Sequence, residues 1–133
     1  MPSRRAVVSE GTTAFYEATG IPAAVIEPSG QRVYVTGQTG DRADGSFADD
    51  PREQIRQTFR NVGGALAAAG VGWSEVVELT SYHVGFRAQI DYLVDIAQEF
   101  LSKPLPAWTA VGVVELFEEP AVVELSCIAV VPD

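Results

Sequence analysis

The hydrophobic positions between residues 50 and 70 repeat with the spacing of an α-helix. Apolar side chains follow one another at intervals of four or three residues and would form one stripe along a helix: Ile55, Phe59, Val62, Leu66 and Ala69. Asp50 is a suitable N-cap, Pro51 suits the first helical position, and Glu53 stands where a capping box places its glutamate. Gly70 can adopt the left-handed conformation that ends a helix. The pattern predicts a helix over residues 51–69.

A second stripe with helical spacing occupies residues 90–101. Its apolar members are Ile90, Leu93, Val94, Ala97, Phe100 and Leu101. The pair Lys103-Pro104 follows directly, and proline cannot continue a helix. The chain therefore carries two predicted amphipathic helices.

Other apolar segments are rich in β-branched and aromatic residues and predict strands. They lie at residues 32–36, 76–84, 108–114 and 121–131. A glycine-bracketed turn, residues 37–40, ends the first of them. The last two are joined through Glu118-Glu119-Pro120, which is typical of a turn, so we expect these two strands to pair antiparallel. Within the first thirty residues the pattern is weaker, and short strands are expected at residues 6–8 and 23–26.

The order of these elements predicts a single α/β domain of the α+β type over residues 1–133, with one mixed β-sheet and both helices packed on one face. Two helices can cover only one side of the sheet. Burying the opposite apolar face favours association of several copies of the chain.

Composition and charge narrow the function. Apolar residues make up 47% of the chain and charged residues 20%, a balance typical of a soluble globular protein. A formal charge of -9 with no cluster of basic residues argues against nucleic-acid partners, which require Lys and Arg at phosphates. No apolar run has the length of a signal peptide or membrane span, so we expect no membrane partner and a cytoplasmic location. The single cysteine, Cys127, lies in an apolar run and is interpreted as a buried, inert thiol.

Several short blocks together resemble the Rid (YjgF-like) family, formerly called endoribonuclease L-PSP. The blocks are Gly37-Gln38 after a strand, Asn61 and Ala68-Ala69-Gly70 in the first helix, Pro106-Ala107, and Val123-Glu124-Leu125 close to Ile128-Ala129. They occur in the right order and spacing from about Val33 to the C-terminus. The resemblance implies a chorismate-mutase-like homotrimer in which strands of two neighbouring subunits build each active cleft. It also implies hydrolysis of reactive enamines and imines, such as 2-aminoacrylate, to a keto acid and ammonia.

The resemblance assigns a catalytic role to one residue and departs from the family at three others. Glu124 matches the family's glutamate, which positions or activates the attacking water. Trp108 stands where an arginine grips the substrate carboxylate, Ala23 where a tyrosine lines the cleft, and Asp91 where the second helix carries an asparagine. The segment around Trp108 is most similar to the YjgH-like branch, which shares this tryptophan.

The residue types suggest what each position could contribute to substrate binding. Trp108 would supply a flat stacking wall and one N–H donor but no positive charge, so a planar neutral or cationic substrate fits better than a carboxylate. Alternatively, the Trp108 ring simply fills the cleft. Gly37 and Gln38 would offer backbone N–H groups and an amide, or simply form a turn. Neighbouring candidates for contact with the substrate are Thr36, Ala110, Tyr82, His83 and Asp91. Tyr82 and His83 must point to opposite faces of their strand, so only one of them can line a given cleft.

Three functions are compatible with these features. The first is an enzyme that hydrolyses an imine, an enamine or a related activated carbon–nitrogen bond with Glu124 and a bound water. The second is a trimeric metabolite-binding protein without catalysis, and ribonuclease activity ranks last because of the acidic charge. His83 is the only histidine and the acidic residues show no ligand spacing, so we expect no metal and no cofactor. The expected partners are a small-molecule substrate and further copies of the chain.

Overall fold

The computed structural model describes residues 4–27 and 29–132. The elements, with η for short 3-10 helices, are in chain order β1 (Arg5–Val7), α1 (Thr13–Thr19), β2 (Ala24–Ile26), β3 (Arg32–Gln38), α2 (Pro51–Ala68), η1 (Trp73–Glu75), β4 (Val76–His83), η2 (Phe86–Ala88), α3 (Ile90–Ala97), β5 (Ala107–Gly112) and β6 (Val123–Val130). The predicted strands and both long helices are therefore confirmed, including the two short strands near the N-terminus. Together they form a mixed α+β fold.

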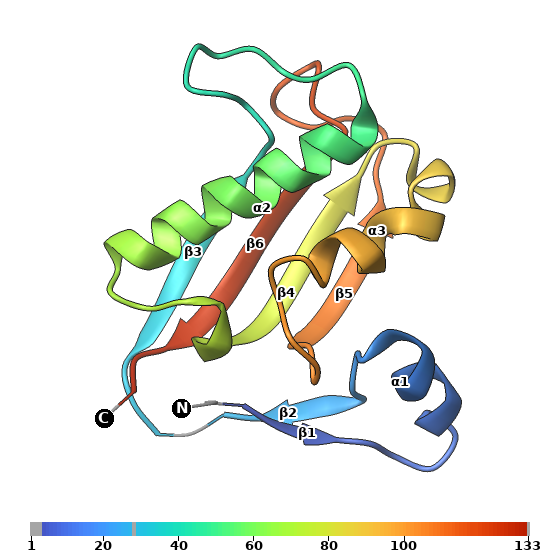
Figure 1. Cartoon of the computed structure of the whole chain (residues 1–133), viewed down its shortest axis with the longest axis vertical. Coiled ribbons are helices and arrows are strands. Elements are labelled where there is room, and N and C mark those ends of the chain that lie inside the picture. Colours follow the sequence, from blue (N-terminus) through green and yellow to red (C-terminus); the bar gives the residue numbers. More distant parts are fainter. Residues whose placement is uncertain (1–3, 28, 133) are drawn as a thin grey trace.

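The main sheet has the strand order β3-β6-β4-β5, with β4 and β5 parallel and the other pairs antiparallel (Figure 1). The prediction that β5 and β6 pair with each other was wrong, because β4 lies between them. The connection from β5 to β6 carries the chain past the end of β4. Val113 N donates to His83 O at its start, and Val84 N donates to Val122 O at its end. The turn at Glu118 is present within this connection, where Ala121 N donates to Glu118 O.

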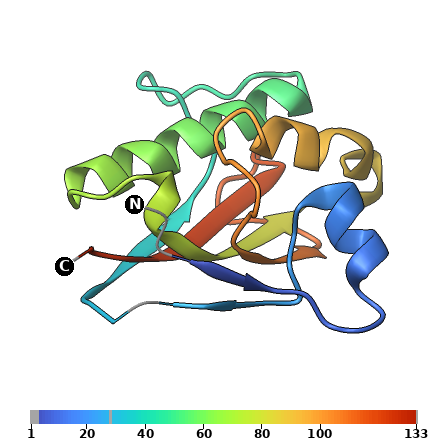
Figure 2. The ribbon, with the colours of Figure 1, turned by 60° about the horizontal axis from the view of Figure 1, so that its bottom comes forward.

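Helices α2 and α3 lie on the same side of the four-stranded sheet, as predicted (Figures 1 and 2). Asp50 caps α2 by accepting from Arg52 N at 2.9 Å, and Gly70 adopts a φ of +82° just beyond its end. The predicted capping box does not form, because the Glu53 carboxylate pairs with Arg56 instead. Helix α3 ends at Ala97, and its predicted last turn continues as turns that still bury Leu101.

Helix α1 was not predicted from the sequence. It has seven residues, lies between Gly11 and Gly20, and buries none of its side chains. A helix this short shows less than two full turns of periodicity, so its pattern cannot be distinguished from that of a loop. With the two-stranded β1–β2 sheet it forms an N-terminal unit beside the end of the main sheet at which β4 and β5 begin (Figure 1).

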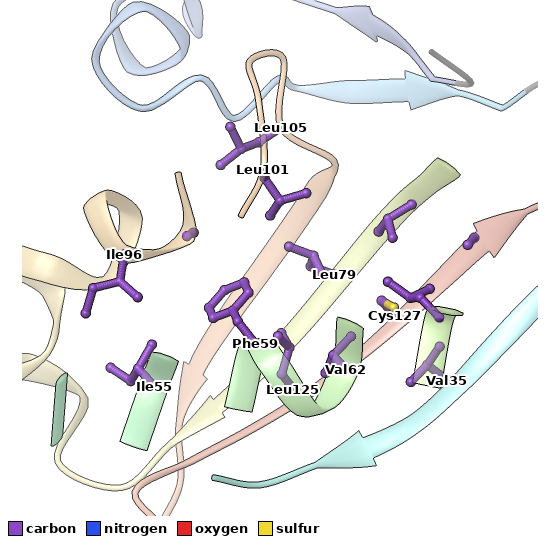
Figure 3. Packing of buried hydrophobic residues seen from close by; sticks show 14 of the residues in the cluster. Val35, Ile55, Phe59, Val62, Leu79, Ile96, Leu101, Leu105, Leu125 and Cys127 are labelled. Carbon is purple, nitrogen blue, oxygen red and sulfur yellow. The ribbon is translucent and has the colours of Figure 1, made fainter. Parts of the chain in front are cut away.

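The hydrophobic core fills the space between the sheet and the two helices (Figure 3). Ile55 and Phe59 of α2 pack there against Leu79 of β4 and Leu125 of β6, all at most 2% exposed. Cys127 also points into this core, and burial raises the pKa of its thiol to about 12. The prediction that the cysteine is buried is confirmed.

Among the described residues, no helix covers the opposite face of the sheet. Along β6, Val123, Leu125 and Cys127 are buried, whereas the alternating Glu124 and Ser126 are half-buried. Tyr34 of β3, whose side chain belongs to this outer face, is 68% exposed. The helix-covered side is therefore the only core side of the sheet within the described residues, and we call the other side the open face.

Candidate functional site

The carboxylate of Glu124 lies on the open face directly against Gly37. A register shift separates the pairs Val35↔Cys127 and Gln38↔Leu125, so β3 carries an extra residue opposite β6 at this point. The bulge brings Gly37 under the Glu124 side chain, and a Cβ atom built on Gly37 would overlap the carboxylate. Glycine is therefore required here to make room for the acid in its observed position.

Tyr82 is the cross-strand partner of Glu124 in the antiparallel pairing of β4 with β6. Directly paired residues point to the same face, so the phenol ring and the carboxylate lie side by side on the open face. Thr36 is exposed in the same stretch of β3. These residues, with Gly37 and Glu124, form what we call the carboxylate half-site.

Gln38 does not join this group. Its side-chain amide donates to Thr36 O at 3.0 Å, and its other neighbours line a separate shallow hollow that includes Arg60 and Asn61 of α2. The register shift at Gly37 moves Gln38 away from Glu124. Sequence reasoning, which grouped Gly37 with Gln38, had no means of locating this bulge.

Trp108 lies on the other side of the sheet. It pairs with Leu79 of the core, and its ring meets Phe59 edge-on at 6.5 Å between centroids. Together with Ala110 it forms the floor of a pocket of about 440 Å³ between α1, α3 and β5, the elements seen at the right of Figure 1. The pocket is lined by Phe15, Ala18, Thr19, Ile21, Phe86, Ile90, Leu93, Val94, Asp95, Trp108 and Ala110. We call it the apolar half-site.

The indole N–H of Trp108 is already used within the chain. It donates to Ser81 Oγ at 2.9 Å, and the same oxygen lies 2.8 Å from His83 Nε2. His83 Nδ1 lies 2.7 Å from Gln89 Oε1, and the Gln89 amide donates onward to the carbonyl oxygens of Val84 and Val122. Trp108 therefore offers the pocket a ring surface and not the donor expected from its residue type.

His83 does not face a cleft. It is 0% exposed, and both ring nitrogens have partners in the hydrogen-bond chain just described. Burial lowers its pKa, partly opposed by the hydrogen bond to Gln89. The proposal that His83 contacts a substrate is corrected on this ground. Its neighbour Tyr82 is the residue of the pair that reaches the open face.

Asp91 is exposed in the first turn of α3 and is not among the residues that line the apolar half-site. Asp95, one helical turn later, is among them. Phe15, Ile21, Phe86 and Asp95 were missed by the sequence reasoning. A signal existed for the first of them, because Phe15 and Ala18 are three residues apart and can share a helix face.

The structure therefore divides the predicted site residues between two faces of one sheet. Glu124, Gly37, Tyr82 and Thr36 lie on or beside the open face, whereas Trp108 and Ala110 lie on the helix-covered side. No group of three His, Cys, Asp or Glu side chains suited to a metal ion occurs among the described residues. None of the helices in residues 4–27 and 29–132 is both long enough and apolar enough to span a membrane.

Comparison with known proteins places these features in a family. The family model described as endoribonuclease L-PSP matches residues 13–131. The RutC family protein YjgH of Escherichia coli K12 is 36% identical over 114 residues, which cover 85% of this chain and 86% of that protein. A protein of Dermatophagoides farinae named 2-iminobutanoate/2-iminopropanoate deaminase is 32% identical over 77% of this chain and 80% of its own length.

Similarity also extends to a solved structure. The crystal structure of YyfB of Yersinia pestis, described as a protein of unknown function of the Rid family, superposes with a TM-score of 0.87. The match covers 97% of this chain and 99% of the other, at 24% sequence identity. At that identity the match supports the fold rather than an activity.

Proposed function

The chain belongs to the endoribonuclease L-PSP family, also called the Rid or YjgF-like family, and from this premise we propose that it hydrolyses an imine, an enamine or a related activated carbon–nitrogen bond. The reaction would take place in clefts between the subunits of a chorismate-mutase-like homotrimer. The substrate is a small molecule. The resemblance and the deaminase named among the relatives support the reaction class. The division of the site over two faces supports the location between subunits.

The observation that carries the proposal is the separation of Glu124 from the apolar half-site. Glu124 lies on the open face, and the pocket floored by Trp108 lies on the helix-covered side of the same sheet. One substrate cannot reach both within one chain. A cleft that uses both must take the carboxylate half-site from one copy and the apolar half-site from its neighbour, and a ring of three copies would repeat this contact three times.

Exposed apolar side chains support association of the chain. Tyr34 and Val111 are 68% and 38% exposed, and both belong to outward-pointing strand positions. Val114 and Phe117, in the connection between β5 and β6, are 93% and 94% exposed. Apolar side chains gathered on one uncovered sheet face and one loop are typical of a protein interface.

Glu124 would act as the base that activates water. A carboxylate within hydrogen-bond reach of a water can accept its proton while the oxygen attacks the carbon of a C=N bond. Gly37 leaves room for that carboxylate, and the Tyr82 hydroxyl lies on the same face and could orient the water or the leaving nitrogen. The products would be a carbonyl compound and ammonia.

Two single-site variants test the catalytic proposal. Ammonia release from freshly generated 2-aminoacrylate, corrected for the spontaneous rate, is compared for the unaltered chain, Glu124→Ala and Trp108→Arg. Loss of turnover in Glu124→Ala supports the hydrolase. Turnover that appears only in Trp108→Arg means that the natural substrate lacks the carboxylate for which the family uses arginine.

A mixing experiment tests the inter-subunit location. Glu124→Ala lacks the acid but keeps the pocket, whereas Ala110→Phe keeps the acid but fills the pocket. If each cleft combines halves from two copies, refolding the two inactive variants together at equal concentrations should restore about a quarter of the clefts. Mixtures that stay inactive while native mass shows mixed trimers would contradict the shared cleft, and a monomeric mass would overturn it outright.

One observation favours a second function, a metabolite-binding protein without catalysis. The resemblance implies that Trp108 stands where the family's enzymes bind the substrate carboxylate, and the Trp108 N–H donates to Ser81 Oγ instead of facing a ligand. If none of the three proteins releases ammonia in this assay but ligand binding is measurable, the result would select this alternative. Ribonuclease activity ranks below both of these functions, because a net charge of -9 disfavours binding to the phosphates of RNA.

A further inference from the structure

The apolar half-site has an unusual balance of charge for a pocket that would hold an imino acid. Nine of its eleven lining residues are apolar, and Asp95 is the charged residue among them. Two cationic side chains are close to the pocket residues, one in the sequence and one in space, but neither lines the pocket. Arg87 follows Phe86 in η2, and Lys103 packs over Gly20. No positive charge of the described chain therefore faces a ligand in this pocket.

The polar groups of the pocket wall are already engaged by the protein. The Trp108 N–H donates to Ser81 Oγ at 2.9 Å. The Thr19 hydroxyl donates to Phe15 O at 2.8 Å and accepts from Ile21 N at 3.0 Å, which closes the end of α1. A carboxylate placed here would leave water and find no donor in return, and burial of an unpaired charge is strongly unfavourable. The Asp95 carboxylate, by contrast, is exposed at the pocket.

We propose that this pocket selects a flat apolar group that carries a positive charge and no carboxylate, and that Asp95 is the residue that pairs with that charge. The proposal rests on the proposed function in one respect, since a second copy must complete the cleft with Glu124. That contribution adds another acid, so the assembled cleft would present two carboxylates to the ligand. The substrate class is therefore an apolar iminium ion, and a protonated amine of the same shape is its stable analogue.

A positive charge also suits the chemistry. Protonation makes the carbon of a C=N bond more electrophilic, and a nearby carboxylate favours the protonated form. Water adds its oxygen to that carbon while Glu124 accepts a proton and returns it to the nitrogen. The C–N bond of the resulting carbinolammonium then breaks while Glu124 takes the hydroxyl proton and passes it to the departing ammonia, so that RCH=NH2+ and H2O become RCHO and NH4+. Atoms and charge balance without an oxidant, a reductant or a metal ion.

Binding of matched ligands tests the charge preference without any need for turnover. Isothermal titration of the full chain with 2-phenylethylammonium, 3-phenylpropanoate and 2-phenylethanol compares a cation, an anion and a neutral molecule with the same phenylethyl body. We expect the cation to bind about tenfold or more tightly than the anion, because the pocket attracts one charge and repels the other. Equal or tighter binding of the anion, or no binding of any of the three at millimolar concentration, would overturn the proposal.

Two neighbouring acids on α3 provide a matched pair of variants. Asp95→Asn removes the charge that lines the pocket, and Asp91→Asn removes one that does not. Both residues are exposed, so neither change should affect folding, which circular dichroism can verify. Asp95→Asn should weaken cation binding about two- to fivefold, as expected for a solvent-exposed ion pair, and leave 2-phenylethanol unchanged. An equal effect of the two variants on cation binding would contradict the role of Asp95.

A turnover measurement separates this inference from the proposed function. The imine of phenylacetaldehyde can be generated in place by an amine oxidase acting on 2-phenylethylamine, and ammonia release is then followed with and without the protein. The expected binding preference without turnover supports the ligand class and overturns the hydrolase. Turnover of 2-aminoacrylate without any preference for the cation supports the hydrolase and overturns the ligand class.

Discussion

The indole N–H of Trp108 donates to Ser81 Oγ, and the Gln89 amide at the other end of the same hydrogen-bond chain determines the tautomer of the buried histidine between them. The Gln89 side-chain nitrogen donates to two carbonyl oxygens, so its oxygen faces His83 Nδ1 and must accept from it. Neutral His83 then carries its proton on Nδ1, and Nε2 accepts from the Ser81 hydroxyl, whose oxygen has accepted from Trp108. Each donor in this series of hydrogen bonds meets one acceptor. The series therefore links Trp108, in the pocket wall, to the backbone just before Glu124.

This network predicts a pH dependence of stability. Burial lowers the pKa of folded His83 below the unfolded value of about 6.5, so the unfolded chain takes up a proton first. The contribution of His83 to the free energy of unfolding is complete above about pH 6.5 and is lost as the pH falls toward the folded-state pKa. Over this range the free energy of unfolding changes by up to about 1.4 kcal/mol per pH unit. Urea unfolding between pH 7.5 and 5.5 measures the slope, and a His83→Gln variant should lack it.

Nuclear magnetic resonance provides an independent check of the same prediction. His83 is the only histidine of the chain, so the imidazole signal needs no assignment. Its titration midpoint in the folded protein should lie below the ordinary value of about 6.5. A titration midpoint at or above 6.5 in the folded protein would contradict a buried neutral ring.

Ser81→Ala should destabilise the protein by about 1–3 kcal/mol, because it leaves Trp108 Nε1 and His83 Nε2 without their partner in a largely apolar environment. Ser126→Ala is the control. Ser126 lies on β6 at the half-buried open face, opposite Thr80. Chemical denaturation compares the two, and equal stabilities would mean that the hydrogen-bond chain contributes nothing.

Arg4→Ala should release the N-terminal unit from the main domain. Arg4 directly precedes β1, and its guanidinium donates at 3.2 Å or less to the carbonyl oxygens of Pro104, Trp73, Ser74 and Val76, all outside the N-terminal unit. Losing charge-assisted bonds of this kind should speed amide hydrogen exchange in β1 and β2 about tenfold or more, while α2 stays protected. Arg5→Ala, at the adjacent exposed position, should leave exchange unchanged. Similar exchange in the two variants would contradict the anchoring role.

Gly37→Ala should impair turnover far more than stability. The new methyl group would occupy the space of the Glu124 carboxylate, whereas the backbone of Gly37 does not require a positive φ. The acid can rotate away at a cost below about 1 kcal/mol of stability, but misplacing it by about 1 Å can slow a reaction on the order of 10²-fold. Gly64→Ala, where a Cβ meets open space on α2, should keep full activity and raise helix stability. Normal ammonia release by Gly37→Ala would indicate that Glu124 is not the base.

Much of the fold was predictable because its signals are local. The apolar stripe from Ile55 to Leu66, the cap at Asp50 and the glycine at position 70 specify α2 within twenty residues of sequence. The same holds for the apolar run that became β6, in which Cys127 was correctly expected to be buried. The resemblance to the Rid family, carried by blocks such as Val123-Glu124-Leu125, also proved correct.

Contacts between distant residues were beyond the reach of these signals. Alternation shows that β5 and β6 are strands, yet it does not show that β4 separates them, because pairing depends on residues 29 or more positions apart. Likewise, the bulge that brings Gly37 to Glu124 and turns Gln38 away exists only once β3 and β6 are in register.

The sequence by itself determined the two long helices, the strands, the family and the chemical types present: an acid at position 124, an indole at position 108 and a histidine at position 83. Only the tertiary structure decided which of them can meet. It placed Glu124 and Trp108 on opposite faces of one sheet, buried His83, and brought Asp95 to the pocket in place of Asp91. The physical reason is that residue type and periodicity are local properties, whereas the face, partner and solvent exposure of a side chain depend on how the whole chain packs.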